Sequence, residues 1–134
     1  MKKVDLNTLV RTSGHVVRGT VVDLRSYWDG GHHAIHTDVV VAVTQDLKQT
    51  SLPPEVVVTV LGGVVDGIGL TVEDEPRFSV EEDVLLFLNK KDGTYEVNCL
   101  FQGKYTVDQG TVVELQVPVS KFVSRIERKI EELE

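Results

Sequence analysis

The sequence predicts a single, mainly β domain. Valine accounts for 26 of the 134 residues, and its branched Cβ favours the extended backbone of a pleated sheet. Short apolar runs recur along the chain and are separated by Gly, Asn, Asp and Pro, which is typical of strands joined by turns. A chain of this length can bury one core and has no room for a second of similar size. We therefore expect residues 1–134 to form one domain.

Two helices flank the expected strands, and the strands occupy a barrel over about residues 15–116. Helical spacing of apolar residues predicts the two ends, and alternation or short apolar runs predict the middle. In chain order, the predicted elements are a helix over about 5–13, strands over 15–25, 33–44, 55–61, 83–88, 94–100, 104–107 and 111–115, and a helix over about 119–133.

The first helix has both a start and a stop signal. Leu6, Leu9 and Val10 recur at helical spacing. Asp5 precedes them, and its carboxylate can cap the N–H groups of a first turn. Because Gly14 ends the pattern, we expect a short amphipathic helix that closes one end of the fold.

The positions of glycine, proline and an Asp-Gly pair predict where the first strands bend and end. Gly19 predicts a bulge or a bend inside the first strand. The Asp-Gly and Gly-Gly pairs within residues 26–31 predict the turn that follows, because they adopt positive φ angles. Pro53 and Pro54 end the next connection, since proline cannot donate to a ladder.

The connection between the third and fourth strands is long. Gly62 and Gly63 end the third strand, and residues 64–76 hold further glycines and an acidic run, which predicts a partly irregular excursion. The apolar run 84–88 predicts a central, buried strand. Cys99 lies in the alternating strand that follows, where we expect a small buried apolar group.

The last helix is amphipathic, with charged residues opposite its apolar face. Ser120 or the residue before it is the expected cap. If the apolar face exceeds what the barrel end can cover, it is expected to pair with a second copy, giving a homodimer through this helix. The face consists of Phe122, Val123, Ile126, Ile130 and Leu133.

Five principal strands, with one long connection between the third and fourth, predict a small closed or partly open Greek-key β-barrel of the OB type. A β-sandwich is the alternative architecture, because a single sequence does not show which strands pair.

Composition excludes several classes of protein. The net charge of −7 and the pI near 5.1 lack the positive footprint of nucleic-acid-binding proteins. No apolar run reaches the roughly 18 residues of a membrane span. The single cysteine makes neither an internal disulfide nor a structural zinc site. We therefore expect no nucleic-acid partner and no membrane insertion.

Three histidines form the candidate metal site. Imidazole is a common ligand of transition metals. On a strand, His32 and His36 share a face but lie about 13 Å apart at ~3.3 Å per residue, and His33 points to the other face. A metal site would need a turn here and a carboxylate such as Asp29 or Asp38. The competing interpretation is an exposed hairpin tip.

No group of residues predicts catalysis. Ser13 and His15 are close in sequence, but no nucleophile elbow surrounds them. Cys99 has no base beside it in the pattern, and the glycines after the third strand lack the Lys-Ser/Thr of a phosphate-binding loop. We therefore expect no catalytic residue and no cofactor. Tyr27 and Trp28 are instead an aromatic pair at a turn, where a binding module can hold a ligand.

Short motifs spread over the whole chain resemble one family. They are Val16–Val21, Ser26–Trp28, Ile35–Thr37, Leu47–Lys48, Gly62–Gly63, Pro76–Phe78, Val84–Leu88 and Gln102–Tyr105. The set is similar to a family of uncharacterised prokaryotic proteins, small β-rich domains that often carry export signals and sometimes adjoin matrixin-type metalloprotease domains. The resemblance implies a β-rich fold and an extracytoplasmic or cell-envelope location, and it implies no activity. If Met1 is the natural start, we expect the chain to stay in the cytoplasm instead.

The resemblance also has departures. Family members tend to have Gly at the position of Glu82, and the pair His32-His33 lies outside the shared pattern, which weakens the metal-site hypothesis. The shared glycine pair and the shared Arg77-Phe78 mark the excursion as the special surface. With the aromatic pair, the predicted ligand-binding residues are Tyr27, Trp28, Gly62, Gly63, Arg77 and Phe78.

The sequence therefore favours a non-enzymatic β-barrel domain that binds a protein or a small ligand at the cell envelope. The first alternative is a metal-binding protein or metalloenzyme that uses His32, His33 and His36. The second is a single-stranded nucleic-acid-binding OB domain, which the acidic charge disfavours.

Overall fold

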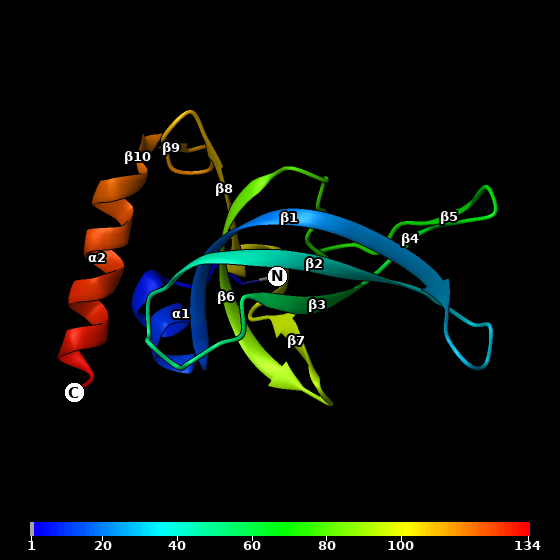
Figure 1. The fold of residues 1–134 in the computed structure, drawn as a ribbon, viewed down its shortest axis with the longest axis horizontal. Coiled ribbons are helices and arrows are strands. Elements are labelled where there is room, and N and C mark those ends of the chain that lie inside the picture. Colours follow the sequence, from blue (N-terminus) through cyan, green and yellow to red (C-terminus); the bar gives the residue numbers. More distant parts are fainter. Residues whose placement is uncertain (1) are drawn as a thin grey trace.

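The computed structural model describes residues 2–134, and strands dominate it (Figure 1). Two α-helices and one short 3-10 helix accompany the strands. In chain order the elements are α1 (Leu6–Thr12), β1 (His15–Trp28), β2 (Ile35–Asp46), β3 (Glu55–Leu61), β4 (Gly63–Val65), β5 (Ile68–Leu70), β6 (Asp83–Lys91), β7 (Thr94–Val97), η1 (Leu100–Gly103), β8 (Lys104–Asp108), β9 (Thr111–Val112), β10 (Val117–Pro118) and α2 (Val119–Glu132).

Five of these strands close into a barrel in the order β1-β2-β3-β7-β6, with β6 paired back to β1. The pairs are antiparallel except β3 with β7, which are parallel. Closure requires β1 to pair with β2 along one edge and with β6 along the other. The predicted barrel is therefore confirmed, and the sandwich alternative is wrong because the sheet returns to its own first strand.

Gly19 lies where β1 bends. The register between β1 and β2 shifts between Arg18 and Gly19 and again between Val21 and Asp23, so the predicted bulge is confirmed. A Cβ at Gly19 would lie 2.4 Å from the carbonyl oxygen of Ala42. Only glycine lets the two backbones approach this closely.

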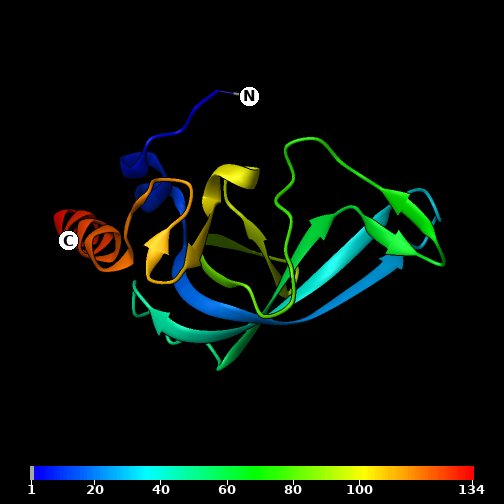
Figure 2. The ribbon, with the colours of Figure 1, turned by 90° about the horizontal axis from the view of Figure 1, so that it is seen from above.

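Strand β6 divides the interior between two cores. Val84, Leu86 and Leu88 face the inside of the barrel, whereas Leu85 and Phe87 face the helices. All five side chains are buried, which confirms the predicted central strand. The helices α1 and α2 cover this second core at the end of the molecule opposite the β4–β5 hairpin (Figure 2).

Helix α1 begins as predicted, because the Asp5 carboxylate accepts a hydrogen bond of 2.8 Å from the Thr8 N–H. The predicted cap of α2 is wrong. The N-cap is Pro118, which makes no side-chain cap bond. Pro118 is the last residue of β10, and the next N–H, of Val119, donates to the carbonyl of Gly110. Strand pairing therefore sets the start of this helix.

The apolar face of α2 is covered mainly by its own chain. Phe122, Val123 and Ile126 are buried in the second core, and Ile130 packs partly against it. Leu133 is exposed. Pairing of two copies through this helix stays a prediction.

The first turn lies later in the chain than predicted, because residues 26–28 belong to β1. Strand β1 continues to Trp28, and β2 begins at Ile35. The Asp29 N–H donates to the Ala34 carbonyl, and the Asp29 carboxylate accepts from the His33 N–H at 2.8 Å. These bonds confine the turn to the residues between the two strands.

Further differences lie in the later connections. The excursion holds a small hairpin, β4–β5, which the prediction missed. Cys99 is half-buried with φ of 59° between β7 and η1, so its predicted place in a strand is wrong. Strand β9 ends at Val112, because a turn replaces the predicted second half of this strand, and the short β10 follows that turn.

Candidate functional site

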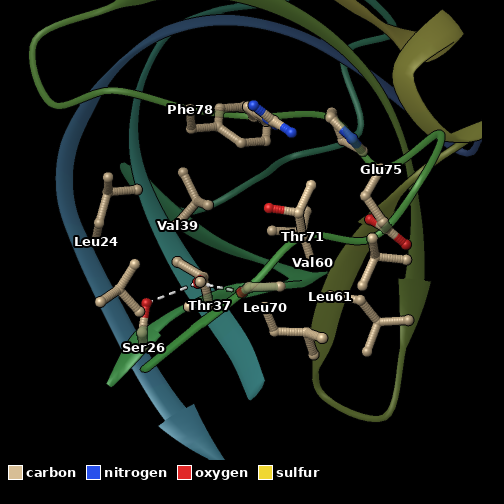
Figure 3. A pocket seen from close by; sticks show the side chains of 17 residues that line it. Leu24, Ser26, Thr37, Val39, Val60, Leu61, Leu70, Thr71, Glu75 and Phe78 are labelled. Atoms are coloured by element: carbon tan, nitrogen blue, oxygen red, sulfur yellow. Dashed lines mark hydrogen bonds between the residues drawn. The ribbon is translucent and has the colours of Figure 1, made fainter. Parts of the chain in front are cut away.

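A cavity of about 410 Å³ lies at the end of the barrel that faces the β4–β5 hairpin. Figure 3 shows side chains around it from β1, β2 and β3 and from residues 62–82, the whole connection between β3 and β6, which is called the excursion from here on. Its lining is mainly apolar. The apolar side chains are Leu24, Val39, Val60, Leu61, Val64, Leu70, Val72, Pro76 and Phe78.

Hydroxyl groups form a polar patch in the wall of this cavity. The Ser26 and Thr37 hydroxyls lie 2.8 Å apart, and the Thr37 hydroxyl donates to the Gly62 carbonyl at 2.7 Å (Figure 3). Thr37 is buried. These polar atoms therefore satisfy one another's hydrogen bonds within the wall.

The predicted glycine pair begins the excursion. Gly62 has φ of 99° and Gly63 has φ of 142°, a region that residues with a Cβ rarely adopt. A Cβ at Gly63 would lie 2.4 Å from the Thr37 hydroxyl and 2.6 Å from the Ser26 hydroxyl. The pair therefore lets the excursion fold tightly over the ends of β1 and β2.

We expect Gly63→Ala to lower the free energy of unfolding by about 1–3 kcal/mol, because it combines backbone strain with a clash in the cavity wall. Urea unfolding measures the change. Gly69→Ala, in the same hairpin, is the control, since its Cβ would meet only the Val64 side chain at 3.8 Å. An equal loss of stability in the two variants would contradict the role assigned to Gly63.

A partly buried ion pair anchors the return of the excursion. The Lys104 ammonium donates to both carboxylate oxygens of Glu82, at 3.0 and 2.9 Å, and to the Arg77 carbonyl. It also lies 4.6 Å from the centre of the Phe78 ring. The anchor therefore holds the predicted Arg77 and Phe78 at the cavity.

A second hollow, the outer groove, has a volume of about 620 Å³ and adjoins the cavity. Its walls are the outer faces of β2 and β3, the first turn and the β6–β7 hairpin. Val60, Leu61 and Glu75 line both hollows. The groove residues are Tyr27, Asp29, Gly30, His36, Asp38, Thr59, Val60, Leu61, Glu75, Lys91, Asp92, Thr94, Tyr95, Glu96, Val97 and Leu100.

Tyr27 and Asp38 are held together in the outer groove. The Tyr27 hydroxyl donates to an Asp38 oxygen at 3.1 Å, and the Thr59 hydroxyl donates to the same oxygen at 2.8 Å. The Tyr27 ring stacks on His36 with ring centres 5.8 Å apart. Partial burial and then the bond to Asp38 raise the pKa of Tyr27, so the phenol stays a donor at neutral pH.

Glu75 stands between the two hollows. Burial raises the pKa of its carboxyl group, the N–H of Leu61 opposes that rise by donating to it, and the charge of Glu96 adds to the rise. The carboxyl group is therefore partly shielded from solvent. A cationic ligand group beside Glu75 would stabilise its charged form and lower its pKa towards the usual value.

The predicted ligand-binding residues divide between separate places. Gly62, Gly63, Arg77 and Phe78 line the cavity, and Tyr27 lines the outer groove. Trp28 lines neither hollow. Its ring stacks on His32 with ring centres 4.3 Å apart.

The structure does not group the three candidate metal ligands. His32 stacks on Trp28, and His36 stacks on Tyr27 in the outer groove. His33 lies at the exposed turn. Among residues 2–134 no three His, Cys, Asp or Glu side chains form a group that could hold a metal ion.

Sequence reasoning missed the outer groove. Asp38, Glu75, Tyr95 and Glu96 come from segments that are distant in the chain, and each has an ordinary local context. Alternation along β2 places His36 and Asp38 on one face, which is the available local signal. No local signal indicated the partner segments.

Comparison with protein-family models found none that matches the chain, and comparison with curated proteins found no match either. No helix in the described part of the chain is long and apolar enough to cross a membrane.

Proposed function

We propose that this chain is a non-enzymatic binding domain of the OB type, and that its cavity holds a small, mainly apolar ligand. The single observation that carries the proposal is the cavity at the mouth of the barrel. It is roofed by a segment that two positive-φ glycines and a partly buried ion pair hold in place. Pockets for small molecules are typically concave, mainly apolar and largely preformed.

The OB assignment is supported by strand order. Counted along the chain, the five barrel strands are β1, β2, β3, β6 and β7. Around the barrel their order is first, second, third, fifth and fourth, and the fourth strand pairs with the first. OB barrels are five-stranded Greek-key barrels that bind ligands on the face of the second and third strands and on nearby loops. Here the same region carries the outer groove beside the cavity.

The chemistry of the cavity limits its ligand. Nine apolar side chains line it, while the hydroxyls of Ser26 and Thr37 bond each other and the Gly62 carbonyl. Glu75 and Arg77 supply one charge of each sign to the lining. We therefore expect a ligand with an apolar body and a small polar end. The envelope location and the family resemblance stay predictions.

Binding of the dye 1-anilinonaphthalene-8-sulfonate tests the proposal, because the dye has an apolar body and one anionic group. We expect one dye per chain. Leu70→Trp should weaken binding about tenfold or more, since Leu70 lines the cavity and an indole would fill part of it.

Val80→Trp is the matched control. Val80 belongs to the same excursion, is exposed and lines neither hollow. Equal affinities of the two variants, or dye binding only to the urea-unfolded chain, would exclude the cavity as the binding site.

A further inference from the structure

We infer that the outer groove binds an extended, basic peptide segment, whose backbone pairs with the end of β3 and whose Lys or Arg side chains meet the groove carboxylates. This inference rests on the proposed function in taking the domain to be a binding module. It concerns the groove and a different ligand from that of the cavity.

The first argument is the open seam between β3 and β7. Their parallel pairing consists of a single bridge, Val58 with Tyr95, and the two strands lie side by side there (Figure 1). Beyond it, residues 59–61 continue along the groove and pair only with β2. A strand edge of this kind can add an extended peptide through backbone hydrogen bonds.

The second argument is the charge of the groove. The lining contains five carboxylates against one lysine, and the carboxylates are Asp29, Asp38, Glu75, Asp92 and Glu96. Lys91 lies 3.7 Å from Glu96 with both side chains largely exposed, which makes this a weak pair. The groove therefore attracts cations and repels the phosphates of nucleic acids.

The third argument is that the groove combines these charges with fixed aromatic rings. Tyr27 and Thr59 both donate to one oxygen of Asp38, which orients the carboxylate. Within residues 2–134 no side chain donates to its other oxygen. The stacked rings of Tyr27 and His36 adjoin this position, and a guanidinium or ammonium group is stable over such a face.

Calorimetric titration with the peptide acetyl-TKVKVKT-amide tests the inference on the full chain. We expect this peptide to bind at least tenfold more tightly than acetyl-TQVQVQT-amide, and its affinity to fall as salt is added. Methylation of its central backbone nitrogens should also weaken binding about tenfold, because it removes donors to the β3 edge.

Isosteric variants locate the site. Asp38→Asn and Glu75→Gln keep the acceptors for Tyr27, Thr59 and Leu61 but lose the charge, so each should weaken peptide binding about tenfold while the fold persists. Asp66→Asn removes an exposed carboxylate that lines neither hollow and should leave the affinity unchanged.

Three results would overturn the inference. The first is equal affinity for the basic and the neutral peptide. The second is a loss of affinity in Asp66→Asn as large as that in Asp38→Asn. The third is spermidine binding as tight as peptide binding, together with no effect of backbone methylation on the peptide. The last result would indicate a site for small cations. Leu70→Trp should leave peptide binding intact while it weakens the dye, so failure at the groove and failure at the cavity are distinguishable.

Discussion

Replacing Phe122 with alanine is expected to lower the free energy of unfolding by about 3–5 kcal/mol. Phe122 is 1% exposed, and its ring centre lies 4.8 Å from that of Tyr105 on β8. It belongs to the core that also holds Leu85 and Phe87 of the central strand. Truncation would leave a cavity between α2 and the barrel, and small domains have only about 5–15 kcal/mol of stability in total.

Urea unfolding followed by two signals measures this loss. Far-ultraviolet circular dichroism reports the backbone, and fluorescence reports Trp28, the single tryptophan, at the other end of the molecule. We expect both transitions to shift together, because α2 and the barrel share the core around Leu85 and Phe87. Two separated transitions would show instead that α2 unfolds alone.

Leu133→Ala is the control for the Phe122 experiment. Leu133 is the C-cap of the same helix and continues its apolar stripe, but it is 51% exposed. Its truncation should change the stability by about 0.5 kcal/mol or less. A loss close to that of Phe122→Ala would indicate that Leu133 is covered in solution, and so would favour the predicted pairing of two copies.

The second large effect is expected at the excursion anchor. Glu82→Gln should cost about 2–3 kcal/mol, because it leaves the partly buried Lys104 ammonium with only part of its partners. The side chains of Lys104 and Glu82 are 11% and 17% exposed. The Glu82 carboxylate also accepts from the Thr106 hydroxyl at 3.1 Å and from the Ser79 N–H at 3.2 Å. Dye binding in the cavity should weaken with the loss of the anchor.

Two further variants distinguish the loss of the Lys104–Glu82 ion pair from the loss of any carboxylate charge as the cause of the lower stability. Glu96→Gln removes the exposed pair with Lys91 and should cost less than about 1 kcal/mol. Replacing Glu82 and Lys104 together with Leu and Met should restore most of the stability, because no charge then remains buried. A double variant as unstable as the single one would contradict the account.

Local patterns predicted many of the elements. The β-branched run at residues 55–61 predicted β3 with its observed ends, and Asp5 with the apolar spacing behind it predicted α1. The hairpin β4–β5 was missed although Asp66-Gly67 between apolar residues is a turn signal. The two short strands of this hairpin were hidden by the many glycines around them.

The predicted ends of strands and helices were wrong where tertiary contacts outweigh the local conformational preference of the residues. Strand β1 continues through Ser26 to Trp28, because β2 pairs with it along that whole length. Helix α2 starts after Pro118, because β10 pairs with β9. In both cases the pairing partner lies outside the local segment.

The sequence by itself determined the β class, the bulge at Gly19, the glycine pair and the amphipathic ends, because φ preferences, the alternation of strands and helical periodicity act between near neighbours. Only the tertiary structure decided that β6 returns to β1, that Lys104 pairs with Glu82, and that Asp38, Glu75 and Glu96 line one groove. These contacts depend on which distant segments the closed barrel brings together, and no local preference of the chain carries that information.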